Sequence, residues 1–361
     1  TGDVRIEFYA AIKTAEPFLP AGTVIAREQT YVHTFYKKEA TAQQPATSKE
    51  EGNLVAFSGP DFKATFDKQS GLLTSYLYKK HEYILNGQGP RPFFWRAPTD
   101  NDYGANLPVR LKAWKEASYQ EPKAESFQVT PGSNATTIKV TYRFPQTDAR
   151  WDITYKIYAS GVIKVDNRFV AEGDQAPMIP RVGLRMQLPE SFTDLTYYGR
   201  GPKENYRDRR TSQFIGEYAI PVKDMYEPYV RPQENNHRTD IYWCALTDKT
   251  QRGLLLIADR TFELNASNYP LESMDSGDTI DNGAPRTEKT HHRHLTDPLP
   301  EKMVDLFIDY RMMGVGGDDS WGATAHEPYL IRPGKENTIE YGFSLVPFDK
   351  KEDYKYLIRQ Y

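Results

Sequence analysis

Short apolar stretches with a period of two, separated by turn residues, recur through most of the 361-residue chain and constrain its fold most strongly. Residues 62–66 and 73–77 flank a glycine-containing turn, as in a hairpin, and 138–144, 151–157 and 162–169 repeat the alternation. Only 111–117 and 352–359 look helical, too little for an α/β alternation. We therefore predict an all-β protein in which 53–350 form one large antiparallel β-sandwich.

The N-terminal part has a different pattern. Residues 1–36 predict two or three strands around a turn at Pro20 and Gly22, too few for a sandwich of their own. Residues 37–52 are rich in Lys, Glu, Ala and Gln without a periodic apolar face, which is typical of a linker. Because the chain opens directly in a strand pattern, we expect it to be a piece of a longer protein.

Composition narrows the class of partner. The formal charge of −3, with 46 basic and 49 acidic residues well mixed, favours neutral ligands over a nucleic acid. No run of 18 apolar residues predicts a membrane helix. The single Cys244 excludes an intrachain disulfide and a cysteine-based metal cluster.

Four stretches concentrate Gly, Pro, Asn, Asp and Arg beyond what strand packing requires. They contain Phe-Trp-Arg-Ala-Pro-Thr-Asp-Asn-Asp, Tyr-Gly-Arg-Gly-Pro-Lys-Glu-Asn-Tyr-Arg-Asp-Arg, Tyr-Glu-Pro-Tyr-Val-Arg-Pro-Gln-Glu-Asn-Asn-His-Arg and Gly-Val-Gly-Gly-Asp-Asp-Ser-Trp-Gly, within 94–102, 198–209, 224–240 and 313–322. The same four motifs occur in this order in the small-chain, or fifth, domain of large bacterial beta-galactosidases of glycoside hydrolase family 2, which the chain resembles from about Leu54 to Pro347.

The resemblance implies a domain organisation. Residues 53–361 would form the small-chain supersandwich, which is galactose mutarotase-like in fold. Residues 1–36 resemble the last strands of the immunoglobulin-like linker domain that precedes it in the family, and 37–52 would connect the two. In the family this domain packs beside a catalytic (β/α)₈ barrel, whose pattern is absent from these 361 residues.

The resemblance also limits what this chain can do. The family's two catalytic glutamates and its magnesium and sodium ligands lie on the barrel and its neighbours, so we assign no catalytic residue, metal ligand or cofactor here. The expected function is that of an accessory region of a retaining beta-galactosidase, inactive alone, which binds a galactoside together with the barrel. The parent can be a homo-oligomer, and its compartment, bacterial cytoplasm or periplasm, stays open.

One site residue carries over from the family. Trp321, in Gly-Gly-Asp-Asp-Ser-Trp, matches the tryptophan that reaches the mouth of the barrel and forms a platform for the sugar. The C–H groups on one face of a pyranose suit an indole ring, and Gly314, Gly316 and Gly317 permit tight or left-handed backbone in a loop that presents the ring. The alternative is that Trp321 plugs the end of the sandwich core.

Several other residues resemble catalytic or metal-binding residues, but we expect structural roles for them. Asp318 and Asp319 are adjacent, so their carboxylates point apart in extended backbone, and capping of the loop's own amides suits them better. We expect Glu204 and Glu234 to accept hydrogen bonds rather than to act on substrate, with these donors: Arg200, Arg207, Arg231 or Arg238. One further set has two interpretations, the lining of a sugar cleft or an ionic network that locks a loop against the barrel or the linker domain, and we expect the second: Arg96, Asp100, Asn101 and Asp102. The histidine tract resembles a metal site by composition, but we expect a structural role for it: His291, His292 and His294.

Two other functions stay open at this point. An independent aldose mutarotase needs a histidine and a carboxylate that converge on the anomeric centre, with these candidates: His237 or His326, and Glu234 or Glu327. A galactoside-binding module is compatible with the 25 tyrosines, whose rings offer flat faces to sugars.

Overall fold

The computed structural model describes residues 2–35, 44–171, 178–276, 294–319, 321–332, 334 and 338–360. The chain divides into two compact units, 1–41 with 355–361 and 42–354. The smaller unit contains an antiparallel hairpin of β1 (Gly2–Ala11) and β2 (Val24–Phe35), within the range for which two or three strands were predicted. Apolar side chains such as Phe8 are exposed on it.

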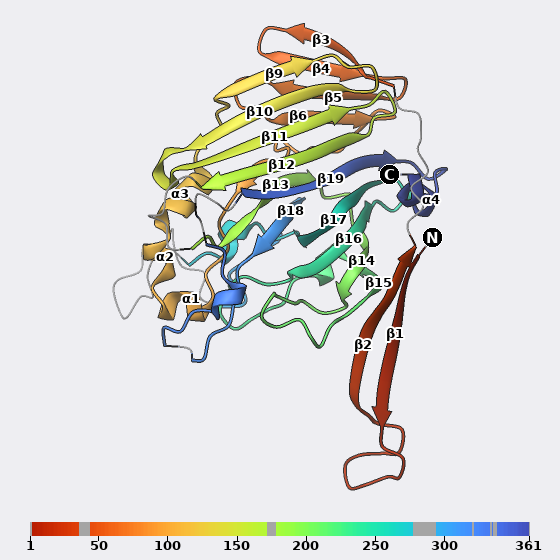
Figure 1. Cartoon of the computed structure of the whole chain (residues 1–361), viewed down its shortest axis with the longest axis vertical. Coiled ribbons are helices and arrows are strands. Elements are labelled where there is room, and N and C mark those ends of the chain that lie inside the picture. The colour runs from red at the N-terminus through yellow and green to blue at the C-terminus, as the bar shows by residue number, and fades with distance from the viewer. Residues whose placement is uncertain are drawn as a thin grey trace. The chain divides into compact units, whose positions relative to one another are not determined.

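Two antiparallel sheets make up the larger unit, as Figure 1 shows. A five-stranded sheet has the order β3-β4-β5-β6-β7. Its strands are β3 (Thr47–Glu51), β4 (Leu54–Ser58), β5 (Phe62–Asp67), β6 (Leu73–Tyr78) and β7 (His81–Glu82). The predicted hairpin around Gly71 is present, because β5 and β6 pair antiparallel and Gly71 has a positive φ of 77°.

The second sheet is larger and curls across the length of the unit (Figure 1). Its main path runs β15-β14-β16-β17-β19-β12-β11-β10-β9, and β13 joins β8 and β18 beside it. Its strands are β8 (Arg91–Phe93), β9 (Ser126–Thr130), β10 (Thr136–Phe144), β11 (Ala149–Ile157), β12 (Ile163–Ala171), β13 (Arg181–Pro189), β14 (Asp194–Gly201), β15 (Phe214–Pro221), β16 (Arg238–Thr247), β17 (Gly253–Ser267), β18 (Met303–Met312) and β19 (Thr338–Phe348).

Alternation along the strands decides which face of the large sheet is buried. In β11, Trp151, Ile153 and Tyr155 are buried, and the residues between them are half-buried on the other face. Tyr155 lies 5.0 Å from Phe66 of the five-stranded sheet, measured between ring centroids, so the two sheets share this core. The fold is the predicted large antiparallel β-sandwich.

The helices are few and short. Helix α3 (Lys112–Tyr119) and helix α4 (Tyr354–Gln360) lie within a few residues of the two predicted helical segments. Helix α1 (Asp100–Gly104) and helix α2 (Leu107–Arg110) were not predicted, although Thr99 and Asp102 form a capping box that marks the start of α1. Single 3₁₀ turns lie at Pro145–Thr147, Val222–Asp224, Leu271–Met274 and Glu327–Tyr329.

One part of the range 37–52 is not a linker. Residues 47–51 form strand β3, which pairs with β4 at the edge of the five-stranded sheet. All five side chains of β3 are exposed, so the strand has no apolar alternation that a sequence pattern could reveal. Among the described residues, no helix is long and apolar enough to span a lipid bilayer.

Candidate functional site

Trp321 lies on the loop that follows β18, and its side chain is 87% exposed. Its backbone N–H donates to Asp319 Oδ1 at 2.8 Å, and the same oxygen accepts the amide of Ala323 at 3.3 Å. These amides lower the pKa of Asp319. The predicted capping role of Asp319 is therefore confirmed, whereas Asp318 contacts His326 Nε2 at 2.8 Å.

Arg96 holds the start of this loop from inside the protein. Its side chain is 2% exposed and donates to the carbonyl oxygens of Met313 at 2.7 Å and Gly314 at 3.1 Å. Two further bonds, at 2.9 and 2.7 Å, join Arg96 to the carboxylate of Asp102. A bidentate pair of this kind fixes orientation as well as charge, so the predicted loop-fixing network exists around Arg96.

Asp208 holds the next two residues of the loop. Its carboxylate accepts the backbone N–H groups of Val315 at 3.2 Å and Gly316 at 2.6 Å. A Cβ atom on Gly314 would lie 2.7 Å from Asp208 Cγ, and one on Gly317 only 2.5 Å from the carbonyl oxygen of Ala323. These two glycines are needed because the backbone lies close to neighbouring atoms. Among the described glycines of this loop, Gly322 alone has a positive φ, of 145°, which favours glycine.

Of the two other members of the predicted network, Asp100 lies outside it and Asn101 contacts the loop. Asp100 is exposed and receives a bond from Arg231 Nη1 at 3.3 Å. Asn101 donates to the carbonyl oxygen of Val315 at 3.4 Å and so makes one further contact with the loop.

Glu204 and Glu234 are both hydrogen-bond acceptors, as predicted, but the arginines suggested for them were wrong. Glu204 accepts from Arg209, Tyr229 and the backbone N–H of Asn236. Glu234 accepts from Asn265 Nδ2 at 2.8 Å and contacts Arg181 Nη2 at 3.5 Å. The suggested arginines instead contact other groups: Asp240 for Arg200, Glu263 for Arg207, Asp100 for Arg231 and the Tyr197 hydroxyl for Arg238.

A buried carboxylate fixes the end of β18, from which the Trp321 loop departs. Glu263 is fully buried and receives the Met312 backbone N–H at 2.7 Å. It also contacts His237 Nε2 at 3.0 Å and is paired with Arg207. Burial alone would raise the pKa of Glu263, but the hydrogen bond from His237 and the charge of Arg207 outweigh burial and lower that pKa to about 2.

A second buried ion pair lies beside it. Asp309 is opposite Glu263 in the ladder of β17 and β18, and Asp309 Oδ2 is 3.3 Å from Arg181 Nε. Burial raises the pKa of Asp309 to about 7, and the charges of Arg181 and His237 offset only part of that rise. The charge at this position therefore depends on pH near neutrality.

The candidate mutarotase pairs do not form an accessible acid–base site. His237 Nδ1 is 2.7 Å from Asn265 Oδ1, and the amide of that same Asn265 reaches Glu234, but His237 and Glu234 are 0% and 4% exposed. Glu327 is instead paired with Arg332 at 2.7 Å. His326 is exposed but contacts Asp318 rather than Glu327, so none of the suggested histidine–glutamate pairs forms an accessible acid–base site.

The histidine tract lies largely outside the described residues, which include His294 but not His291 or His292. His294 is exposed. Within the described ranges, no group of three or more His, Cys, Asp and Glu side chains is arranged to hold a metal ion.

Sequence reasoning missed the groups that position the loop. Asp208 lies in the second motif-rich stretch, which was the available signal. Glu263 and Asp309 interrupt the apolar residues at the buried positions of β17 and β18. A carboxylate at the inward-facing position of such a run indicates a buried partner, because an unpaired buried charge is costly.

The comparisons with known proteins agree with this organisation. The family model described as beta galactosidase small chain matches residues 58–345. A beta-galactosidase of Priestia megaterium (strain DSM 319 / IMG 1521) is 33% identical over 307 residues, which are 85% of this chain and 28% of the relative. A beta-galactosidase of Streptococcus thermophilus is 27% identical over 348 residues, 95% of this chain and 32% of the relative.

The chain thus spans about a third of the length of these relatives. Among solved structures, a galactose 1-epimerase from Lactobacillus acidophilus NCFM has a TM-score of 0.42 and 7% identity, over 86% of this chain and 99% of that one. A similarity that low supports no inference about this chain. The family model covers most of the chain, and the chain belongs to the beta-galactosidase small chain family.

Proposed function

We propose that this chain is an accessory region of a retaining beta-galactosidase that hydrolyses terminal β-D-galactosides such as lactose. The relatives named beta-galactosidase are about three times as long as the matched region, which leaves room in them for a separate catalytic domain. The chain supplies an aromatic wall to the sugar site of a (β/α)₈ barrel, and magnesium and sodium are bound by the barrel. The hairpin of β1 and β2 belongs to the end of an immunoglobulin-like linker domain.

The single observation that carries this proposal is the presentation of Trp321. Its indole is 87% exposed, although burial of a ring of this size stabilises a protein by several kcal/mol. The backbone around it is nevertheless held by Arg96, Asp208 and Asp319. A fixed backbone with an unburied ring suits a partner surface or a ligand better than a core plug.

The proposal is tested in the complete enzyme with Trp321→Ala. Loss of the ring contact should weaken sugar binding by about 1.5–3 kcal/mol, so KM for lactose should rise roughly ten- to hundred-fold. Trp321→Phe should recover part of the loss. Val230→Ala, which removes another exposed apolar side chain, is the matched control and should leave KM within about twofold. Unchanged lactose kinetics in Trp321→Ala would rule the platform out.

The chain alone should not hydrolyse nitrophenyl β-galactoside, because the catalytic glutamates belong to the barrel in this proposal. Isothermal titration of galactose and lactose into the chain should show weak binding or none, since half of the sugar site is absent. Turnover by the purified chain would contradict the accessory role. Tight binding of neutral galactose would instead favour a galactoside-binding module.

A further inference from the structure

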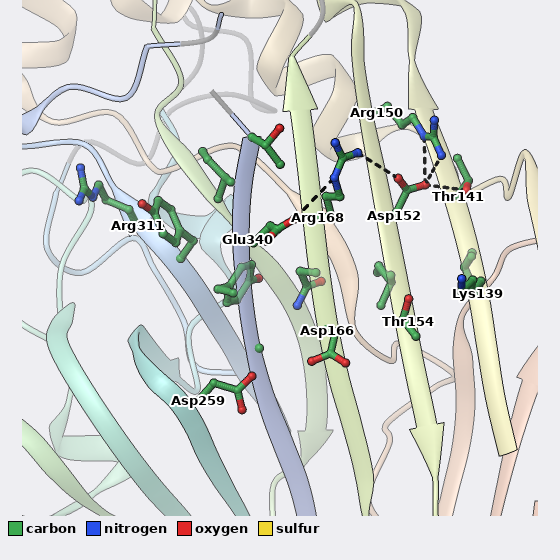
Figure 2. A pocket seen from close by; sticks show the side chains of 18 of the residues that line it. Lys139, Thr141, Arg150, Asp152, Thr154, Asp166, Arg168, Asp259, Arg311 and Glu340 are labelled. Carbon is green, nitrogen blue, oxygen red and sulfur yellow. Dashed lines mark hydrogen bonds and ion pairs between the residues drawn. The ribbon is translucent and has the colours of Figure 1, made fainter. Parts of the chain in front are cut away.

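A wide groove lies on the half-buried face of the large sheet, away from Trp321. Its volume is about 1290 Å³, above the roughly 300–1000 Å³ of a pocket for a drug-sized molecule. The floor is formed by β10, β11, β12 and β19, and one side by β17 and β18 (Figure 2). Trp321 is not among its lining residues. The groove is therefore a separate candidate site.

The acidic groups that line the groove all have cationic partners. Asp152 is paired with Arg150 at 2.9 Å, and Arg168 lies 3.6 Å from Glu340; this network forms the dashed part of Figure 2. The two other acidic lining residues are paired with lysines: Asp166 with Lys156 and Lys164, and Asp259 with Lys164. Their negative charge is therefore largely neutralised within the protein.

The β17–β18 side of the groove has positive charge without such compensation. Arg311, on β18, lies apart from the paired network in Figure 2. Its Nε is buried and has no hydrogen-bond partner among the described residues. Arg260, on β17, is exposed, and no carboxylate in the described part of the chain forms an ion pair with it. Arg207 also lines this side, but its charge is compensated by Glu263.

Neither Arg311 nor Arg260 has a carboxylate partner among the described residues, so the positive charge of this side of the groove favours an anion that comes from outside the protein. Guanidinium groups bind carboxylates, sulfates and phosphates in preference to neutral acceptors, because the hydrogen bonds are charge-assisted. The recognised group is therefore an oxyanion.

The neighbouring side chains suit an organic ligand larger than a free ion. The rings of Tyr310, on the β18 side, and Tyr341, on the β19 floor, both line the groove, with their centroids 6.1 Å apart. Tyrosine rings offer flat apolar faces with a polar edge, as the C–H face of a pyranose requires. Further along the groove, the hydroxyl groups of Thr154 and Thr261 are available to hydroxylated rings.

We propose that this groove is a second saccharide site, specific for anionic sugars, in which Arg311 and Arg260 bind a carboxylate or sulfate and Tyr310 and Tyr341 contact the ring. The site does not depend on the function proposed for Trp321. It would bind acidic residues of a glycan at a distance from the sugar that the enzyme hydrolyses.

Isothermal titration of the whole chain with galacturonate, galactose 6-sulfate, neutral galactose and inorganic sulfate tests the proposal. At least one of the two acidic sugars should bind at least tenfold more tightly than both galactose and inorganic sulfate, and the preferred one identifies the oxyanion. Binding should weaken several-fold between 0.05 and 0.5 M NaCl, because screening reduces attraction between charges. The proposal would be overturned if neutral galactose, or inorganic sulfate, bound as tightly as the acidic sugars.

Arg311→Met should reduce affinity for the preferred acidic sugar at least tenfold. Arg260→Met, at an exposed position where folding is not at risk, should reduce it about threefold or more. Arg143→Met is the matched control: Arg143 is exposed, paired with Glu125 and absent from the groove lining, so affinity should stay within twofold. If Arg260→Met folds as the parent does and binds the acidic sugar equally well, the assignment is wrong.

Trp321→Ala separates this site from the proposed platform. The variant should keep full affinity for the acidic sugar in the isolated chain, even where the complete enzyme loses affinity for lactose. Loss of acidic-sugar binding in Trp321→Ala would show that the two sites are one and would refute a separate groove site.

Discussion

Two parts of the sandwich interior are both buried, but one consists of aromatic side chains and the other of charged ones. Around Phe94, rings from four other positions pack with centroids 5.0 to 5.5 Å from it: Trp114, Phe144, Trp151 and Phe169. Around Glu263, the fully buried groups are instead Arg181, His237 and Asp309. We refer to these sets as the aromatic interior and the charged interior.

The aromatic interior contributes mainly to the stability of the fold, and the charged interior mainly to the position of the Trp321 loop. Burial of apolar area stabilises the aromatic interior without dependence on direction or pH. Removing charges from water is costly, and their mutual attraction offsets that cost only when the geometry is good. The charged interior instead fixes the position of the backbone, since Glu263 accepts the Met312 N–H directly before the Trp321 loop. Four predictions test this division.

The largest effect is expected in the aromatic interior. Phe94→Ala should lower the free energy of unfolding by about 3–5 kcal/mol, because a large cavity forms among rings that cannot collapse into it. The loss should be the same at pH 5 and pH 8, measured by urea denaturation. Phe18→Ala, the same change at a fully exposed side chain, should alter stability by less than about 0.5 kcal/mol. A strongly pH-dependent loss in Phe94→Ala would break the comparison.

In the charged interior, Glu263→Gln should cost about 3 kcal/mol of unfolding free energy. The change keeps the shape but leaves the Arg207 charge without its buried partner. Glu340→Gln makes the same chemical change at an exposed pair on the groove and should cost less than about 0.5 kcal/mol. Equal effects of the two variants would mean that burial does not distinguish these ion pairs.

Asp309 should make stability fall as pH rises from about 5 to 8. Its pKa is about 7 in the folded protein against about 4 when unfolded, so the folded state binds a proton that the unfolded state has released. The stabilising contribution is complete below pH 4 and is lost as pH passes 7, which amounts to at most about 2.6 kcal/mol between pH 5 and 8. Asp309→Asn should remove this slope, and an unchanged slope in that variant would assign the pH dependence to other groups.

The smallest effect should be local to the Trp321 loop. Asp208→Asn should speed hydrogen exchange at the amides of Val315 and Gly316 about tenfold, since each loses a charge-assisted acceptor worth about 1.5 kcal/mol. The Met312 amide, held by Glu263, is the internal control and should be unchanged. If Met312 exchanged faster as well, the two anchors of the loop would form a single cooperative unit.

The sequence predicted the strands whose burial alternates. β10, β11 and β12 show this most clearly, because one face of each packs against the core and the pattern records that. β3 escaped prediction because all of its side chains face solvent. Helices α1 and α2, with five and four residues, are too short to show a helical period.

For the site, the motif-rich stretches identified the loop and Trp321 but not how the loop is held. Asp319 lies two residues from the amide that it binds, so a local pattern sufficed. Asp208 is 107 residues from Val315, and Arg96 is 217 residues from Met313. No spacing in the chain encodes contacts of that range.

The sequence by itself determined the class of fold, its antiparallel strands, the family and the loop that carries Trp321. These depend on local periodicity and on ordered motifs, which each stretch of chain carries independently of the rest. Only the tertiary structure decided that Glu263 and Asp309 share a buried interior with Arg181 and that Arg311 lines a groove. The physical reason is that the burial and the partners of a charged side chain decide what it does. Strands distant in sequence supply both.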